Sequence, residues 1–155
     1  MERDTKELIQ GVCINEKGEL LLCLHVRSTG EKEWTLVGGK HDTYFATLTM
    51  LQEFKQELKW NINVGEVLIT FHHEDGRGKV TSTLYNIHMV IGETTQLKTD
   101  EIAAIKWIQR ITVEEALREK AKEETRVVLD GYPISYLTHR ILRWLHREYN
   151  HPEWI

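Results

Sequence analysis

The stretch from Trp34 to Ile62, WTLVGGKHDTYFATLTMLQEFKQELKWNI, limits the folds open to this chain more than any other. Its first residues predict a short strand that ends in a tight loop at Gly38 and Gly39, because glycine allows backbone conformations that other residues avoid. A connector follows the glycines. A helix is then expected to begin between residues 43 and 46 and to end at residue 59 or 60.

The two faces of this predicted helix differ in polarity. An apolar set recurs at the three-and-four spacing that is typical of a buried helical stripe: Leu51, Phe54 and Leu58. A polar set has the same spacing on another side, so its side chains converge: Glu53, Gln56 and Glu57. Two carboxylates one turn apart, beside a glycine loop with exposed amides, suit a divalent metal and a phosphorylated ligand.

The rest of the chain interleaves strands with helices. Strands are predicted at residues 8–14 and 20–26 as a hairpin, at 62–73 and 80–91 as a second hairpin with a loop at 74–79, and at 103–108. Thr112 and Glu115 form a capping box for a helix that runs to about residue 124, and Pro133 suits the first position of a last helix. This order predicts an α/β or α+β class, with a mixed sheet sandwiched between helices.

Length and composition bound the function. With 155 residues the chain is expected to form a single domain over 1–155. A net charge of -4 argues against a sequence-independent nucleic-acid binder.

No apolar run reaches the length of a membrane span, and the charged N-terminus lacks the core of a signal peptide, so a cytoplasmic location is expected. Cys13 and Cys23 lie in apolar runs and are expected to be reduced core thiols.

The opening stretch resembles the signature of the Nudix hydrolases, the MutT-like family, G-x5-E-x7-R-E-U-x-E-E-x-G-U, where U is a bulky apolar residue. Laid on Gly38, the signature keeps its register to Trp60 without a gap. Five positions match: Gly38, Glu53, Phe54, Glu57 and Trp60. Four depart, so the box is degenerate: Tyr44 and Gln56 stand for glutamates, Gln52 for the arginine and Lys59 for the second glycine.

The resemblance extends across nearly the whole chain and implies the Nudix fold. It also implies a hydrolase that binds Mg²⁺ or Mn²⁺ and cleaves a diphosphate linked to a further group, with water as the nucleophile. The implied catalytic residues are Glu53 and Glu57, and Glu53 or Glu101 would position or deprotonate the water. The implied metal ligands are Glu53, Glu57, Gln56 and Glu101. The implied substrate contacts are Gly38, Gly39, Lys40 and Arg27, with His25 beside Arg27 as another basic candidate.

The departures from the signature leave the activity open. Gln56 can offer an amide oxygen but no charge, so the helix site has a charge of about -2 where the signature gives about -3. Tyr44 and Gln52 replace a glutamate and an arginine of the signature. Because both charges are lost together, no lone unpaired charge is left, and the helix can still fold. The alternative is a catalytically weak or inactive Nudix-fold nucleotide-binding protein, and a regulatory or protein-interaction role is a third hypothesis. The exact substrate and the oligomeric state stay open, a homodimer being one option.

Overall fold

The chain divides into two compact units, each made from two separate segments. The first unit comprises residues 1–13 and 37–95, and the second comprises residues 14–36 and 96–155. The computed structural model describes residues 6–40, 45–75, 78–89, 101–109, 112 and 128–148. The single domain that the length predicts stays a prediction.

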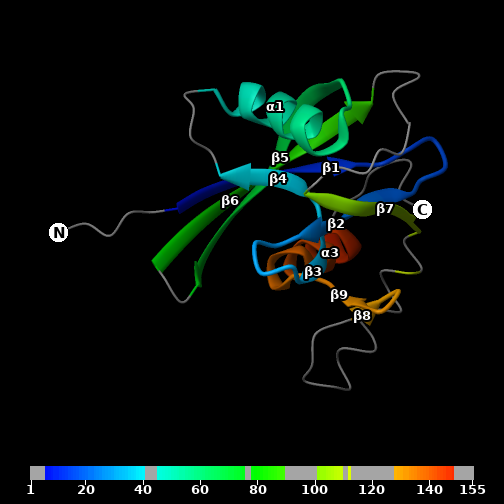
Figure 1. Ribbon diagram of the computed structural model, residues 1–155. Coiled ribbons are helices and arrows are strands. Elements are labelled where there is room, and N and C mark those ends of the chain that lie inside the picture. The colour runs from blue at the N-terminus through cyan, green and yellow to red at the C-terminus, as the bar shows by residue number, and fades with distance from the viewer. Residues whose placement is uncertain are drawn as a thin grey trace. The chain divides into compact units, whose positions relative to one another are not determined.

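The first unit contains a four-stranded mixed sheet with the order β4-β1-β6-β5 (Figure 1). β1 (Lys6–Cys13) pairs antiparallel with β4 (Val37–Lys40) and parallel with β6 (Gly78–Met89). β6 pairs antiparallel with β5 (Ile62–Asp75), and the register of that pair shifts on either side of Val67. The predicted mixed sheet is therefore confirmed, and so is the second hairpin, although its strands run further into the expected loop.

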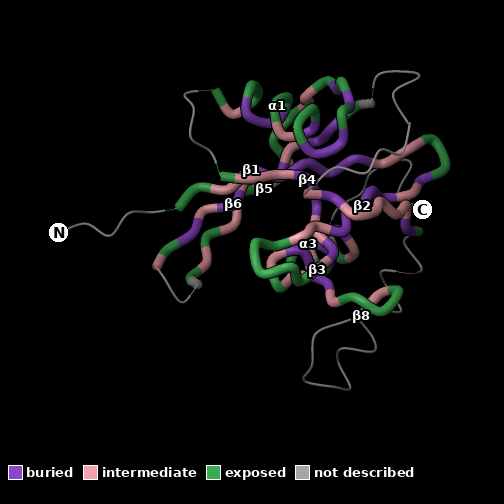
Figure 2. The backbone as a smooth tube through the Cα atoms, viewed as in Figure 1, coloured by how far each residue is buried: buried purple, intermediate pink, exposed green. Residues whose placement is uncertain are grey.

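Helix α1 (Ala46–Leu58) packs on β4, β5 and β1 of this sheet. It begins within the predicted window. Figure 2 shows buried and exposed positions alternating along its turns. Phe54 and Leu58 are buried as predicted, but Leu51 is 36% exposed, so its place in the buried stripe was wrong. The buried positions of the helix are Thr49, Met50, Phe54, Glu57 and Leu58.

Helix α1 ends at a residue in the left-handed backbone conformation, which glycine usually adopts but which Lys59 adopts here. Lys59 has a φ of 62° and a ψ of 28°, which is the left-handed conformation. Its N–H donates to the carbonyl of Lys55, and the Trp60 N–H donates to the carbonyl of Phe54. These bonds satisfy carbonyls at the helix end, and they offset the cost of about 1 kcal/mol for a side chain in this conformation. Lys59 thus holds the turn for which the Nudix signature uses glycine.

The second unit contains a three-stranded antiparallel sheet with the order β3-β2-β7. β2 (Leu20–Val26) lies between β3 (Lys32–Thr35) and β7 (Ile102–Ile108). A short ribbon of β8 (Val128–Leu129) and β9 (Tyr132–Pro133) precedes helix α3 (Tyr136–Glu148), which packs on β3. The buried side of α3 contains Thr138, Ile141, Leu142 and Leu145.

Two local predictions differ from the structure. Pro133 lies in β9 and does not begin α3. The cap is Ser135, whose Oγ accepts a hydrogen bond from the Thr138 N–H at 3.1 Å. The hairpin expected at residues 8–14 and 20–26 is confirmed only at its turn. Ile14 and Leu20 form one antiparallel bridge around the turn at Asn15 to Gly18, but β1 and β2 belong to different sheets. The helix predicted after Thr112 lies outside the described residues except for Thr112 itself.

Both cysteines are buried free thiols, as predicted. Burial raises the pKa of Cys13 to about 12, so its thiol stays protonated at neutral pH. Neither α1 nor α3, the helices that the structure describes in full, has the length and apolarity that a membrane span requires.

Candidate functional site

In the first unit, a carboxylate of α1 lies directly against Gly39 of β4. A Cβ atom added to Gly39 would lie 2.7 Å from Oε1 of Glu53 and 2.9 Å from its Cδ. Only glycine therefore leaves room for this carboxylate in its observed position. The helix and strand that the Nudix-like stretch predicts are in contact at two of the predicted site residues.

Gly38 and Gly39 do not form the tight loop that the sequence predicted. Both lie within β4, where Gly38 is opposite Gln10 and Gly39 is opposite Ile9 in the antiparallel ladder. A Cβ on Gly38 would lie 2.1 Å from the backbone oxygen of Ile9. The first glycine is thus required by the close approach of the two strands, and the second by the approach of Glu53.

β4 is an edge strand among the described residues, where it pairs with β1 alone. An edge strand leaves alternate backbone N–H groups pointing away from the sheet. Lys40 is exposed at the end of the same strand. Backbone amides and an ammonium group are therefore available along β4, although no loop cradles them.

The three polar side chains of α1 have very different exposures. Glu57 is 3% exposed, Glu53 is intermediate and Gln56 is exposed. Glu57 thus belongs to the buried stripe that the sequence assigned to apolar residues alone. Gln56 lies on the solvent side of the helix.

Glu53 and Glu57 suit a divalent cation by their chemistry and spacing. Mg²⁺ takes oxygen ligands and commonly uses one or two protein carboxylates. Like charges four residues apart on a helix repel each other, and a bound cation removes that repulsion. The donor set of α1 therefore fits the Mg²⁺ or Mn²⁺ that the resemblance implies.

In the second unit, Arg27 and Glu101 lie near the same end of the sheet. The Val26 N–H donates to the Glu101 carbonyl at 2.8 Å, which fixes the backbone of Glu101 beside the end of β2. The Arg27 guanidinium lies 3.9 Å from a carboxylate oxygen of Glu33, and its side chain is 52% exposed. An ion pair this long and open is weak, so the guanidinium remains accessible to an anion.

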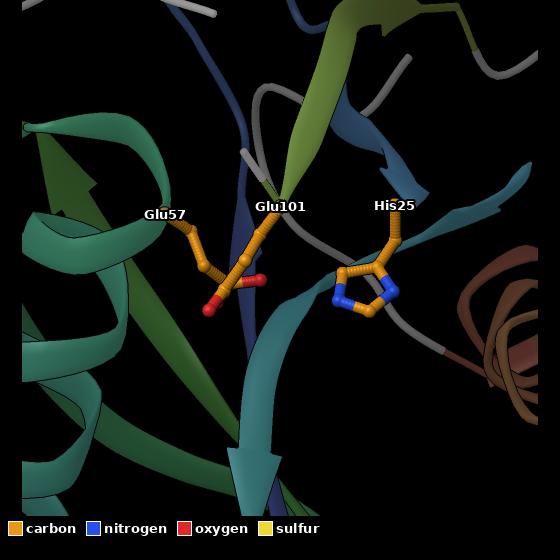
Figure 3. A group of neighbouring side chains, drawn as sticks. All are labelled: His25, Glu57 and Glu101. Carbon is orange, nitrogen blue, oxygen red and sulfur yellow. The ribbon is translucent and has the colours of Figure 1, made fainter. Parts of the chain in front are cut away.

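The side chain of His25 lies close to that of Glu101, which the sequence did not predict. Figure 3 labels Glu57 on α1, His25 near the end of β2 and Glu101 at the start of β7. A ring nitrogen of His25 and a carboxylate oxygen of Glu101 lie within 4.8 Å of each other. The sequence singled out His25 only as a basic residue beside Arg27. No local spacing links it to Glu101, because the two residues are joined only by strand pairing.

Tyr44, which stands for a glutamate of the Nudix signature, lies outside the described residues.

Solved structures resemble this chain over most of its length. A MutT protein from Methanosarcina mazei Go1 is 18% identical with a TM-score of 0.72, covering 97% of this chain and 99% of the other. The NUDIX domain of Shewanella oneidensis NrtR, solved in complex with ADP ribose, is 14% identical with a TM-score of 0.67, covering 96% and 91%. A UDP-X diphosphatase is 16% identical with a TM-score of 0.64, covering 97% of this chain and 66% of the other.

No protein-family model matches the sequence, and no curated protein matches it. At such low identities the structural likeness establishes the fold. The chain has the α+β fold of the Nudix hydrolases, as the resemblance predicted.

Proposed function

We propose that this chain is a Nudix-type hydrolase that cleaves the diphosphate linkage of a nucleoside diphosphate derivative with the help of a divalent metal ion. The observation that carries the proposal is the position of the Glu53 carboxylate against Gly39, within the Nudix fold. A fold alone does not define a function. The proposal therefore rests on the position of Glu53 within the fold as well as on the fold itself.

The acidic residues are proposed as metal ligands, and one of them as the general base. Glu53 and Glu57 bind Mg²⁺ or Mn²⁺, and Glu101 is proposed as a further carboxylate ligand. When bound, such an ion neutralises charge on a diphosphate and lowers the pKa of a coordinated water. Glu53 or Glu101 would accept the proton of the attacking water. Gln56 is proposed to contribute through its amide oxygen, although its exposure makes it the weakest member of the set.

The substrate contacts are proposed on the basic and glycine positions. Gly38 and Gly39 lie in the edge strand β4 with the ammonium of Lys40 at its end, and Arg27 has an accessible guanidinium. These groups suit the oxygens of a diphosphate. ADP ribose in the NrtR domain and the activity in the name of the UDP-X diphosphatase support a nucleoside diphosphate linked to a further group. A cytoplasmic location and a homodimer stay predictions.

The test measures turnover and ligand binding together. Purified protein is incubated with Mg²⁺ or Mn²⁺ and a panel of nucleotide sugars, ADP-ribose, nucleoside triphosphates and dinucleoside polyphosphates. We expect Glu53→Gln to lower kcat about 10²-fold or more, because it removes a charged ligand while keeping the shape. Lys55→Gln, an exposed position on the same helix, is the matched control and should retain activity.

The same experiment distinguishes the alternative function. Calorimetric titration with each nucleotide reports binding whether or not the nucleotide is cleaved. Binding without turnover across the panel would replace the hydrolase with a nucleotide-binding protein, the role that the departures at Gln52 and Gln56 favour. If the Glu53→Gln variant retains turnover, Glu53 has no catalytic role.

A further inference from the structure

The second unit brings an imidazole and a carboxylate together from two strands. A ring nitrogen of His25, near the end of β2, lies within 4.8 Å of a carboxylate oxygen of Glu101, at the start of β7 (Figure 3). Two ligand atoms that are each about 2.1 Å from one ion lie about 3 to 4 Å apart. The pair therefore needs only a small side-chain adjustment to bind one cation.

The backbone around this pair is tightly defined. Leu24 pairs with Ala104, whereas His25 pairs with Ile102, so β7 contains one extra residue, Ala103, at this step. The ladder ends with the hydrogen bond from the Val26 N–H to the Glu101 carbonyl at 2.8 Å. Such bulges bend a strand and redirect its side chains. The register shift thus explains how a residue just before β7 reaches a side chain of β2.

The neighbouring charges leave this pair suited to a cation. Glu33 is opposite His25 on β3, and its carboxylate forms the 3.9 Å ion pair with Arg27. The acid on the β3 side therefore has only a weak ion pair with this guanidinium. On the β7 side, His25 is close to the carboxylate of Glu101.

We propose that His25 is a metal ligand that acts together with Glu101. Neutral imidazole is a common ligand for transition-metal ions, whereas Mg²⁺ is bound almost entirely through oxygen. This inference rests on the proposed function, because Glu101 is proposed there as a carboxylate ligand of a divalent metal ion. It predicts a chain that prefers Mn²⁺ or Co²⁺ to Mg²⁺.

The test observes the nitrogen directly. The full chain is loaded with Mn²⁺, and pulsed electron paramagnetic resonance is used to detect modulation from a coordinated imidazole nitrogen. We expect this signal in the wild type and its loss in His25→Gln, with at least about tenfold weaker Mn²⁺ binding, since even outer-shell partners contribute that much. Mg²⁺ binding should change much less. His72→Gln, an exposed histidine on β5, is the control and should retain the signal.

A second variant covers the case in which His25→Gln does not fold. Glu101→Gln should keep the nitrogen signal while weakening Mn²⁺ binding, because the imidazole is still present. An absent signal in the wild type, or a signal that survives His25→Gln, overturns the proposal. If the protein hydrolyses substrate with Mg²⁺ but the Mn²⁺-loaded protein gives no nitrogen signal, the role of His25 is refuted and the proposed hydrolase is not. A signal that depends on His25 in a protein without turnover supports the ligand and refutes the hydrolase.

Discussion

The two places where the described chain offers metal ligands are built differently. On α1, Glu53 and Glu57 lie one helical turn apart on a single element, and Glu53 is held against Gly39 of the neighbouring strand. At the end of β2, His25 and Glu101 come from segments that are distant in the sequence, and a register shift brings them together. The first arrangement depends on a helical repeat and the second on strand pairing.

This difference separates what a sequence can reveal from what it cannot. The spacing of Glu53 and Glu57 is a local property, because residues four apart on a helix always share a side. The pairing of His25 with Glu101 depends on one extra residue in β7, and a single-residue slip changes which side chains meet. The α1 arrangement could therefore be predicted, and the β2–β7 arrangement could not.

The largest expected effect tests the strand beneath α1. Gly38→Ala should lower the free energy of unfolding by about 3 kcal/mol, because its Cβ would meet the Ile9 backbone oxygen, which can move only with the strand. Urea denaturation measures the change. A loss below about 1 kcal/mol would mean that β1 and β4 separate easily, and the α1 arrangement would then be no more rigid than an ordinary edge strand.

The second effect changes the position of Glu53 while preserving the fold. In Gly39→Ala the new Cβ meets the flexible end of the Glu53 side chain, so stability should change by less than about 1.5 kcal/mol. Turnover should fall about 10²-fold if the carboxylate moves by about 1 Å. The measurement is kcat/KM beside a denaturation curve.

A compensating variant makes this test specific. Adding Glu53→Asp to Gly39→Ala shortens the acidic side chain and gives the new methyl group room, so part of the activity should return. The His25 nitrogen signal should be the same in all these variants. If it changes with Gly39→Ala, the two arrangements are not independent.

The smallest expected effect concerns the exposed side of α1. Gln56→Glu adds a carboxylate at a solvent-facing position and should raise Mg²⁺ affinity by up to about fivefold, as exposed charges contribute at most about 1 kcal/mol. Calorimetric titration with Mg²⁺ measures it. An unchanged affinity would mean that Gln56 is not a metal ligand. Glu53 and Glu57 would then be the two proposed ligands on α1.

Much of the fold was predictable because its signals are local. The strand at residues 20–26 was located at its exact bounds, and α1 began within the predicted window and ended one residue before the predicted end. Apolar runs and helical spacing carry this information without reference to distant segments. The paired strands at residues 62–75 and 78–89 were also expected, because a glycine-rich polar segment separates two apolar ones.

The errors arose where tertiary packing overrides a local preference. Gly38 and Gly39 looked like a turn, yet they are strand residues whose missing side chains admit a neighbouring backbone and Glu53. Leu51 has the spacing of a core residue but is exposed, while the acidic Glu57 is buried. Composition alone does not reveal which side of a helix faces its sheet when both sides contain apolar residues.

The division of each unit between two segments has a consequence for synthesis. The strands of the first sheet have all been made once β6 is complete, whereas β2 must wait for β7. Protein domains generally fold as their residues emerge from the ribosome. During this interval β2, LLLCLHV, is an apolar strand with an unpaired edge, which is a common starting point for aggregation. The yield of this protein should therefore depend on how quickly the ribosome reaches residue 108.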